Sequence, residues 1–255
     1  MQYLLTIQGD ERSYSTLTQD EIADIVGVYQ ALTAEMQQRG AYIGSNRLAP
    51  VSEASSVRVR DDEVVVTDGP FAETKEQLGG YFLIDVESID EAIEWAARLP
   101  TARTGSIEIR PAMALPADVE AHLAAAAAVP SVDSEMECLL LFYYDEHARE
   151  EVPEEQRAVT RRAFVALHDE LGARYLAGLP LRPTETATTV RVREEETVVT
   201  DGPFAETKEQ LGGFFLIGVD SVDEAKAWAA KVPSARFGTV EVRPIVPVRS
   251  GVTVG

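Results

Sequence analysis

The sequence predicts an α+β fold made of two ferredoxin-like domains, each a split βαβ unit with an inserted β-hairpin. Three observations lead to this prediction. A chain of 255 residues with 45% apolar residues is large enough for two separate cores. The segment TDGPFAETKEQLGG occurs twice, at 67–80 and 200–213. Within each half, strand-like and helix-like segments follow the order β-α-β, hairpin, β-α-β.

The chain is a tandem duplication. Residues 57–84 match residues 190–217 at a shift of 133, and only four of the twenty-eight positions differ. The match continues from 85–111 to 218–244. Such a long internal repeat indicates two copies of one domain.

Between the copies lies an Ala-rich segment that contains Pro116 and Pro130. Alanine favours a helix, and proline is tolerated in its first turn but ends it elsewhere, so this linker is expected to be a short helix. It either docks on a domain or forms a solvated tether. The predicted boundaries are 1–113 for the first domain, 114–135 for the linker and 136–248 for the second domain.

The first half begins with a strand and a long helix. The apolar run YLLTI at 3–7 is typical of a central strand covered on both faces. Thr18 and Glu21 form a capping box, which marks the start of a helix that ends at Gly40. The apolar stripe expected to pack on the sheet consists of Ile22, Ile25, Val26, Tyr29, Leu32 and Met36.

The remaining elements of this half follow in order. A strand at 41–48 precedes the segments SSVRVR and EVVVT, which predict a hairpin turned at Asp61 and Asp62. After the repeated loop, GYFLIDV is a buried strand. A capping box from Ser88 to Glu91 opens the second helix, and the alternating segment GSIEIRP closes the half.

The second half repeats this plan, from CLLLFYY through the hairpin TVRVREEETVV to GTVEVRP. A ferredoxin-like sheet carries helices on one face only, so its other apolar face needs a cover. The homologous sheet of the same chain is the simplest cover. We therefore expect a pseudo-dimer within one chain, with the chain itself a monomer or a homodimer.

The composition disfavours several classes of protein. The formal net charge is −20, from 23 basic and 43 acidic residues, which disfavours nucleic-acid binding. The N-terminus lacks the basic start of a signal peptide, and no segment is apolar enough for a membrane span. We expect a cytoplasmic protein. The one cysteine, Cys138, precedes three leucines and is expected to be a core thiol rather than a reactive one.

The repeated loop, the aromatic strand after it, SIDEAIEWA and GSIEIRP together resemble the YCII-related family, in particular its DGPF-domain branch. The resemblance covers both halves. It implies a bacterial protein with a dimeric α+β barrel fold, in which two sheets close face to face. Here the two halves would supply both sheets.

The resemblance also implies functions. YCII-related proteins are similar to small enzymes with a pocket His and Asp, and one branch is linked to removal of chloride from a hydroxylated aromatic. Many DGPF proteins are encoded beside extracytoplasmic-function sigma factors. This chain departs from the enzyme pattern, because residues 1–115 contain no histidine. In the second half, His168-Asp169 lies late in the first helix, and Thr160 stands near the position expected for the family's histidine.

The repeated loop supplies the candidate ligand-binding residues. One interpretation is a pinned loop, in which the aspartate caps a turn, the phenylalanine is an apolar anchor and the lysine pairs with a carboxylate. The other is a pocket rim, where a carboxylate beside an ammonium holds a polar ligand or transfers a proton. The candidates are Asp68, Phe71, Glu73 and Lys75 in the first copy and Asp201, Phe204, Glu206 and Lys208 in the second.

Other residues are weaker candidates, and no catalytic residue is assigned. Arg58, Arg60 and Arg110 either bind an anion or form ordinary pairs on a strand surface. Three scattered histidines without cysteine or carboxylate spacing do not indicate a metal, and no cofactor motif is present. We expect neither a metal site nor a cofactor.

Two functions remain open. The first is binding of a small polar or aromatic molecule between the two sheets, by a binding protein or a cofactor-independent enzyme. The second is a regulatory or scaffolding role, in which the acidic surface binds a partner such as an extracytoplasmic-function sigma factor. The first predicts an enclosed cavity with convergent polar groups. The second predicts a filled interior and an exposed apolar or acidic patch.

Overall fold

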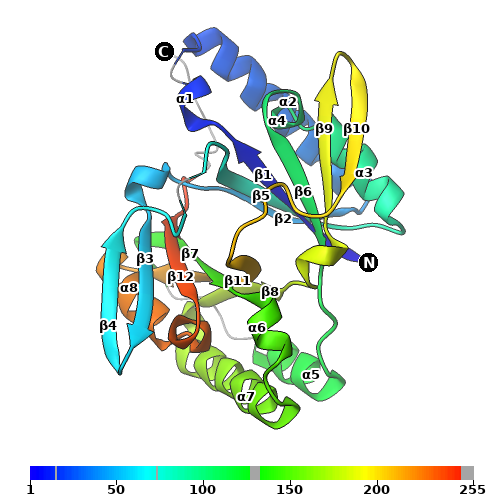
Figure 1. Cartoon of the computed structure of the whole chain (residues 1–255). Helices are drawn as coiled ribbons and strands as arrows, with labels where there is room; N and C mark the ends of the chain where they lie inside the picture. Colours follow the sequence, from blue (N-terminus) through cyan, green and yellow to red (C-terminus); the bar gives the residue numbers. More distant parts are fainter. Residues whose placement is uncertain (15, 73, 127–132, 248–255) are drawn as a thin grey trace.

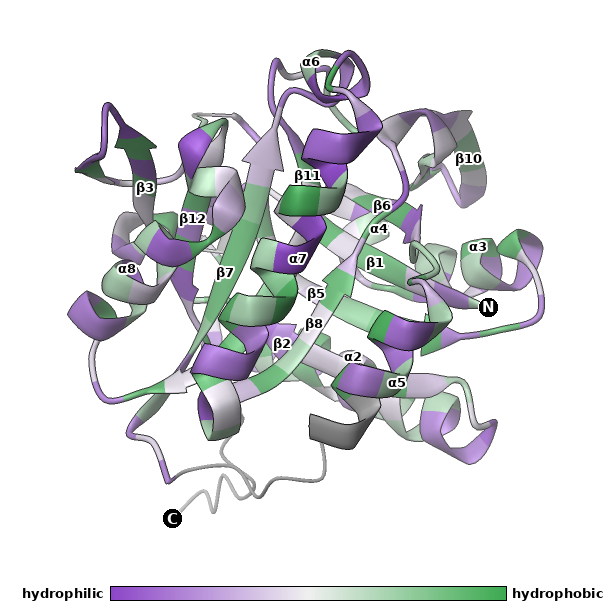
Figure 2. Ribbon diagram, turned by 90° about the horizontal axis from the view of Figure 1, so that it is seen from below, coloured by the Kyte–Doolittle hydropathy of each residue, from purple (hydrophilic) through white to green (hydrophobic). Residues whose placement is uncertain are grey.

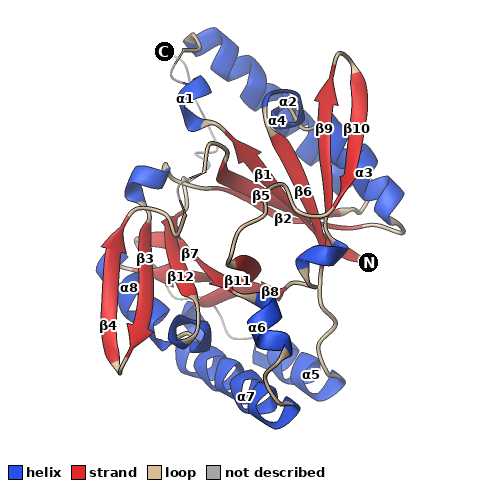
Figure 3. Ribbon diagram, viewed as in Figure 1, coloured by secondary structure: helices blue, strands red, loops and turns tan. Residues whose placement is uncertain are grey.

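Two six-stranded antiparallel sheets face each other, and helices cover their outer faces (Figure 1, Figure 3). The computed structural model describes residues 1–14, 16–72, 74–126 and 133–247. No helix in these ranges is both long enough and apolar enough to cross a membrane. The predicted α+β fold, with two related halves joined as an intramolecular pseudo-dimer, is confirmed.

Both halves contain the elements that the repeat predicts. The first half consists of β1 (Gln2–Gly9), α1 (Glu11–Tyr14), α2 (Gln19–Gln38), β2 (Tyr42–Arg47), β3 (Ser55–Arg60), β4 (Glu63–Asp68), β5 (Gln77–Asp85), α3 (Ile89–Arg98), α4 (Thr101–Thr104) and β6 (Ser106–Pro111). Helix α5 (Ala117–Ala126) lies in the Ala-rich linker. The second half consists of β7 (Met136–Tyr144), α6 (Glu146–Glu150), α7 (Glu154–Leu171), β8 (Tyr175–Pro180), β9 (Thr188–Arg193), β10 (Glu196–Asp201), β11 (Gln210–Val219), α8 (Val222–Lys231) and β12 (Thr239–Pro244).

Each hairpin joins the sheet of the opposite half. The sheet orders are β10-β9-β6-β1-β5-β2 and β4-β3-β12-β7-β11-β8, so β9 pairs with β6 and β3 pairs with β12. In Figure 1 the yellow β9–β10 hairpin stands beside β6, and the cyan β3–β4 hairpin stands beside β12. We expected each half to be complete by itself. Instead, each half completes the sheet of the other.

The long helix α2 is buried over only part of its length. Its capping box is present as predicted, with Thr18 and Glu21 bonded to each other's backbone N–H. Leu32 and Met36 are buried, whereas Ile22 and Val26 are 36% and 39% exposed. A helix of 20 residues is about 30 Å long, and its first turns extend beyond the sheet (Figure 1). The expectation that the whole stripe packs on the sheet is therefore wrong for these turns.

Three apolar cores hold the layers together. The core under the helices of the first half contains Val190 and Val192 from the exchanged hairpin, and the equivalent core of the second half contains Val57 and Val59. Figure 2 shows the apolar colouring of β7 and β1, the central strands of the two sheets. The third core lies between the sheets and consists of Leu4, Leu48, Leu78, Tyr81, Leu139, Leu141, Tyr143, Leu179, Leu181, Leu211, Phe214 and Leu216.

Cys138 lies in the second of these cores and is fully buried, as expected. Burial raises the pKa of its thiol from 9.0 to about 12. At pH 8 the reactive thiolate is therefore about 1,000-fold scarcer than for an unperturbed thiol. We predict that a thiol reagent labels the native protein at least about 100-fold more slowly than the urea-unfolded chain at the same pH. Equal rates in the two states would contradict the burial of this side chain.

Candidate ligand-binding site

The two repeated loops connect the two sheets. Residues 69–76 run from β4 in one sheet to β5 in the other, and residues 202–209 run from β10 to β11 in the same way. Both loops are fastened to the last strand of the opposite half. The backbone N–H of Phe71 donates to Glu241 Oε2 and that of Phe204 donates to Glu108 Oε2, each at 3.0 Å. The loops therefore cross the space between the sheets.

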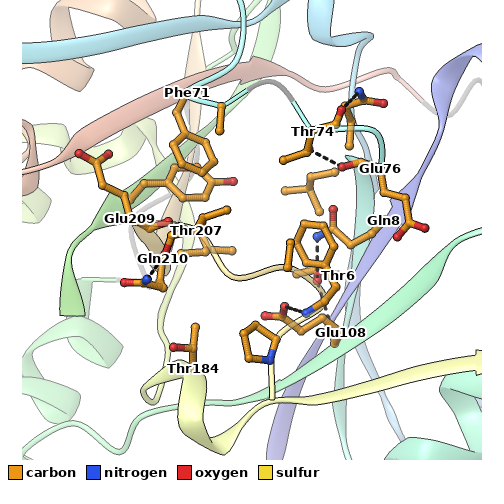
Figure 4. Close-up of a pocket in the computed structure, with 18 of the residues that line it drawn as sticks. Thr6, Gln8, Phe71, Thr74, Glu76, Glu108, Thr184, Thr207, Glu209 and Gln210 are labelled. Atoms are coloured by element: carbon orange, nitrogen blue, oxygen red, sulfur yellow. Dashed lines mark hydrogen bonds between the residues drawn. The ribbon is translucent and has the colours of Figure 1, made fainter. Parts of the chain in front are cut away.

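A cavity of about 70 Å³ lies between the sheets and is lined by both loops (Figure 4). Further lining residues come from strands β1, β6, β7 and β12. Polar side chains outnumber apolar ones in the walls. The polar residues are Thr6, Gln8, Thr74, Glu76, Gln77, Glu108, Arg110, Tyr143, Thr184, Thr207, Glu209, Gln210, Glu241 and Arg243.

Two glutamate–arginine pairs are the most deeply buried charges of this cavity. Arg110 donates from Nη1 to Glu108 Oε1 at 3.3 Å, and Arg243 donates from Nη1 to Glu241 Oε1 at 3.1 Å. The two arginine side chains are 0% and 1% exposed. Because each glutamate also accepts the N–H of a loop phenylalanine, each pair joins the last strand of one half to the loop of the other.

A second carboxylate faces each arginine from the start of a short helix. Glu146 of α6 lies 3.4 Å from Arg110 Nη2 and accepts the backbone N–H of Thr184 at 2.8 Å. Glu11 of α1 lies 3.8 Å from Arg243 Nη2. With a carboxylate on two sides, the charge of each guanidinium is balanced within the protein. The Nε atoms of Arg110 and Arg243 are buried and have no hydrogen-bond partner among the described residues.

The two glutamates of the loops are also held by hydrogen bonds. Ser106 donates to Glu76 Oε2 at 2.7 Å, and Thr239 donates to Glu209 Oε2 at 2.6 Å. Arg191 lies 3.9 Å from Glu76 Oε2. The cavity thus contains four glutamates and two arginines, and each arginine is already paired with one of the glutamates.

The two halves differ in the wall that their first strand contributes. Strand β1 supplies Thr6 and Gln8, whereas β7 has Tyr143 at the position equivalent to Gln8. Tyr143 stacks on Phe71 with ring centroids 3.7 Å apart. Burial raises the pKa of Tyr143 well above its ordinary value, so its hydroxyl stays protonated. Gln8 instead donates from Nε2 to Thr6 Oγ1 at 3.2 Å, which leaves a polar wall on this side.

The comparison with known proteins agrees with the duplicated architecture. A model of the YCII-related domain matches residues 1–115 and again residues 136–249. The chain belongs to the YCII-related family. An uncharacterised protein of Rhizobium meliloti (strain 1021) is 38% identical over 113 residues, which are 44% of this chain and 91% of that protein.

Two solved structures are similar to this YCII-related chain over its length, and each match covers 96% of this chain and 91% of the other. One is a chlorite dismutase variant from Candidatus Nitrospira defluvii, at 6% identity and a TM-score of 0.47. The other is a haem-binding protein from Thermus thermophilus, at 13% identity and a TM-score of 0.48. Assignment to the DGPF branch of the family stays a prediction.

The candidate residues of the YCII-related loop motif fall into two groups. Phe71 and Phe204 line the cavity, and their backbone N–H groups hold the loops to the buried glutamates. The other described candidates do not line it, and all of them are exposed: Asp68, Lys75, Asp201, Glu206 and Lys208. Glu73 lies outside the described residues.

Of the three arginines considered for anion binding, Arg110 lines the cavity and is paired with carboxylates. Arg58 donates from Nε to Thr239 Oγ1 at 2.8 Å, and Arg60 donates to the carbonyl of Ala235 at 2.8 Å. The last two therefore fasten the exchanged hairpin to the second half.

Sequence reasoning missed the buried glutamate–arginine pairs and Gln8. A signal for the pairs is present in GSIEIRP, where Ile107 and Ile109 alternate with Glu108 and Arg110. The isoleucines pack under the helices, so the charged residues occupy the face that the second sheet covers. Charges on a face expected to be covered indicate a polar interior site.

Proposed function

We propose that the cavity between the two sheets binds a small polar molecule. The observation that carries this proposal is the convergence of buried charged side chains from both halves around one space. Burying an ion pair costs desolvation free energy and adds little net stability compared with apolar packing, so binding of a ligand accounts for these pairs better than stability does. The regulatory alternative predicts a filled interior, so the presence of a cavity favours ligand binding over that alternative.

Size and charge narrow the class of ligand. The cavity of about 70 Å³ is roughly half as large as a cavity that holds benzene, which favours the polar class over the aromatic one. Arg110 and Arg243 are balanced by carboxylates, so the walls have no spare positive charge for an anion, and their carboxylate and threonine oxygens can each accept a further hydrogen bond. The ligand we propose is an amine or polyol of a few heavy atoms, which donates hydrogen bonds to them.

The ligand lies against the wall formed by Thr6 and Gln8. On the opposite side, the stacked rings of Phe71 and Tyr143 fill the equivalent space. The amide of Gln8 has both a donor and an acceptor to offer a hydroxyl or amine group. The duplicated fold thus has one polar binding wall rather than two equal ones.

A haem does not fit this cavity. Its volume of about 70 Å³ is far below that of ordinary cofactor pockets. None of the described lining residues is a histidine, cysteine or methionine, and Tyr143, a residue type that can also ligate haem iron, is stacked on Phe71. The proposed ligand is therefore not haem, the group named for the Thermus thermophilus protein.

Gln8→Leu is expected to abolish ligand-induced stabilisation, because leucine keeps the size of the side chain and removes its hydrogen bonds. Thermal unfolding is measured for the wild type and for the variant with small amines, amino alcohols, polyols and phenols. A ligand at 100 times its Kd stabilises the native state by about 2.7 kcal/mol. We expect amino alcohols or polyols to raise the midpoint of the wild type and not that of Gln8→Leu.

The matched control is Tyr143→Phe, which removes a polar atom from the opposite wall and is expected to retain the shift. Equal shifts in wild type and Gln8→Leu would contradict the proposed wall, and stabilisation by phenols alone would contradict the proposed class. NMR spectra of the stabilising compounds, recorded over hours with the protein, test whether binding leads to turnover.

A further inference from the structure

Two histidines and an aspartate from distant parts of the chain meet between the linker helix and the second half. His122 lies on α5, and His168 and Asp169 lie near the end of α7. The two helices are in contact (Figure 1). His122 Nε2 lies 2.7 Å from Asp169 Oδ1, and His168 Nδ1 lies 3.3 Å from the same oxygen.

The donor atoms of this cluster suit a divalent transition metal. One ligand atom from each of the three side chains lies within 4.8 Å of the others. Zinc binds imidazole nitrogen and carboxylate oxygen at about 2.0–2.2 Å, so two ligands of one tetrahedral ion are about 3.3–3.6 Å apart. The 3.3 Å distance already has this value, and the 2.7 Å hydrogen bond has to lengthen by less than about 1 Å.

The surroundings give this cluster both a fixed part and an open part. The side chain of His168 is 4% exposed and its ring packs edge-on against Tyr175, at 4.4 Å between centroids. The side chains of His122 and Asp169 are 46% and 49% exposed. Solvent can therefore reach the ion and supply a fourth ligand, as in zinc sites with three protein ligands.

We propose that His122, His168 and Asp169 bind one divalent metal ion of the zinc class, and that the ion fixes the linker helix on the second half. Nothing in the sequence indicated a metal site, because these residues do not form a ligand motif of short, regular spacing. His122 and Asp169 are 47 positions apart, and only the packing of α5 on α7 brings them together. The site lies on the helix side of the second sheet and is separate from the cavity between the sheets.

The test uses the full chain without a histidine tag. Zinc affinity is measured by competition with a chromophoric chelator, and cobalt is then added to the metal-free protein to record the visible d–d bands of a four-coordinate site. The variants are His122→Ala and Asp169→Asn, which change the two exposed ligands and leave the buried histidine in place. The control is His147→Ala, which removes the exposed third histidine of the chain on α6.

We expect one zinc ion per chain, four-coordinate cobalt bands, and a loss of affinity of more than about 100-fold in His122→Ala and Asp169→Asn. His147→Ala is expected to bind as tightly as the wild type. Zinc should also raise the unfolding midpoint of the wild type and of the control, but not that of the two ligand variants. Circular dichroism without metal verifies that each variant is folded.

Two results would overturn the proposal. If the wild type binds no zinc, the three side chains form only a hydrogen-bonded contact between the helices. If zinc binds the two ligand variants as tightly as the wild type, the ion sits elsewhere on this acidic protein.

Discussion

Residues 1–115 expressed alone are expected to form a homodimer with exchanged hairpins, and not a folded monomer. In the full chain, the outer edge of β6 pairs with β9, and the β3–β4 hairpin lies on the sheet of the second half. A single first half therefore has both a bare sheet edge and a hairpin without a sheet. A second copy of residues 1–115 supplies both the missing strand and the missing sheet edge. Its VRVR segment at 57–60 is identical to the segment at 190–193 in β9, the strand that pairs with β6 in the full chain.

The buried valines of the exchanged hairpin make the expected loss of stability in a monomeric first half large. Val190 and Val192 are buried in the core of the first half, and Val57 and Val59 are buried in the core of the second. Each fully buried valine contributes about 1.5–3 kcal/mol of hydrophobic stabilisation, and the strand adds its hydrogen bonds along the edge of β6. A homodimer would keep these contacts on both sides.

Light scattering coupled to size-exclusion chromatography measures the expected dimer mass. As a control, a first half in which residues 56–67 are replaced by a short Gly/Ser turn should be unfolded or aggregated, because it cannot fill the partner's core. A stable, folded monomer of residues 1–115 at micromolar concentration would be incompatible with the exchange. A dimer made from the first half would also show that one copy of the repeat is sufficient to form both sheets.

Much of this fold could be predicted because its elements are specified locally. Capping residues such as Thr18 mark where helices begin, alternation in VRVR marks a strand, and the repeat itself implies two related sheets. The exchange of hairpins could not be predicted in this way. Both copies have nearly the same sequence in the hairpin and identical VRVR strands, so an edge in either half fits it equally well.

The residues of the candidate site also could be predicted only where the local sequence marks them. Phe71 and Phe204, which line the cavity, stand out in the sequence because each is an apolar residue in a polar loop, and their role in ligand binding stays a prediction. Glu108 and Arg110 look like an ordinary surface pair until the second sheet is known to cover them. His122 and Asp169 are far apart along the chain and meet only through tertiary packing.

Arg110→Met is expected to lower the free energy of unfolding by about 3–5 kcal/mol, the usual effect of removing one partner of a buried ion pair. The change leaves the carboxylates of Glu108 and Glu146 without their shared cation. It also removes the donor to the carbonyl of Arg182. Chemical denaturation of wild type and variant measures the difference.

A double-mutant cycle separates the charge from the shape of the side chain. Glu108→Gln combined with Arg110→Met should cost less than the sum of the two single changes, because the double variant no longer buries an unpaired carboxylate at this position. Additive effects would mean that the two side chains contribute independently, contrary to the 3.3 Å contact between them.

Arg243→Met separates stability from ligand binding, because Arg243 occupies the equivalent position in the other half. Arg243 is as deeply buried as Arg110 and pairs with Glu241 at 3.1 Å, so its loss should destabilise the chain by a similar amount. Its strand, β12, lies beside β7, which contributes Tyr143, whereas β6 lies beside β1, which contributes Thr6 and Gln8.

The Arg110→Met and Arg243→Met variants should therefore have similar free energies of unfolding, but only Arg110→Met should weaken binding of the ligand that lies against Gln8. If both variants lost the ligand equally, the cavity would act as one symmetric site, and the difference between Gln8 and Tyr143 would have no functional meaning.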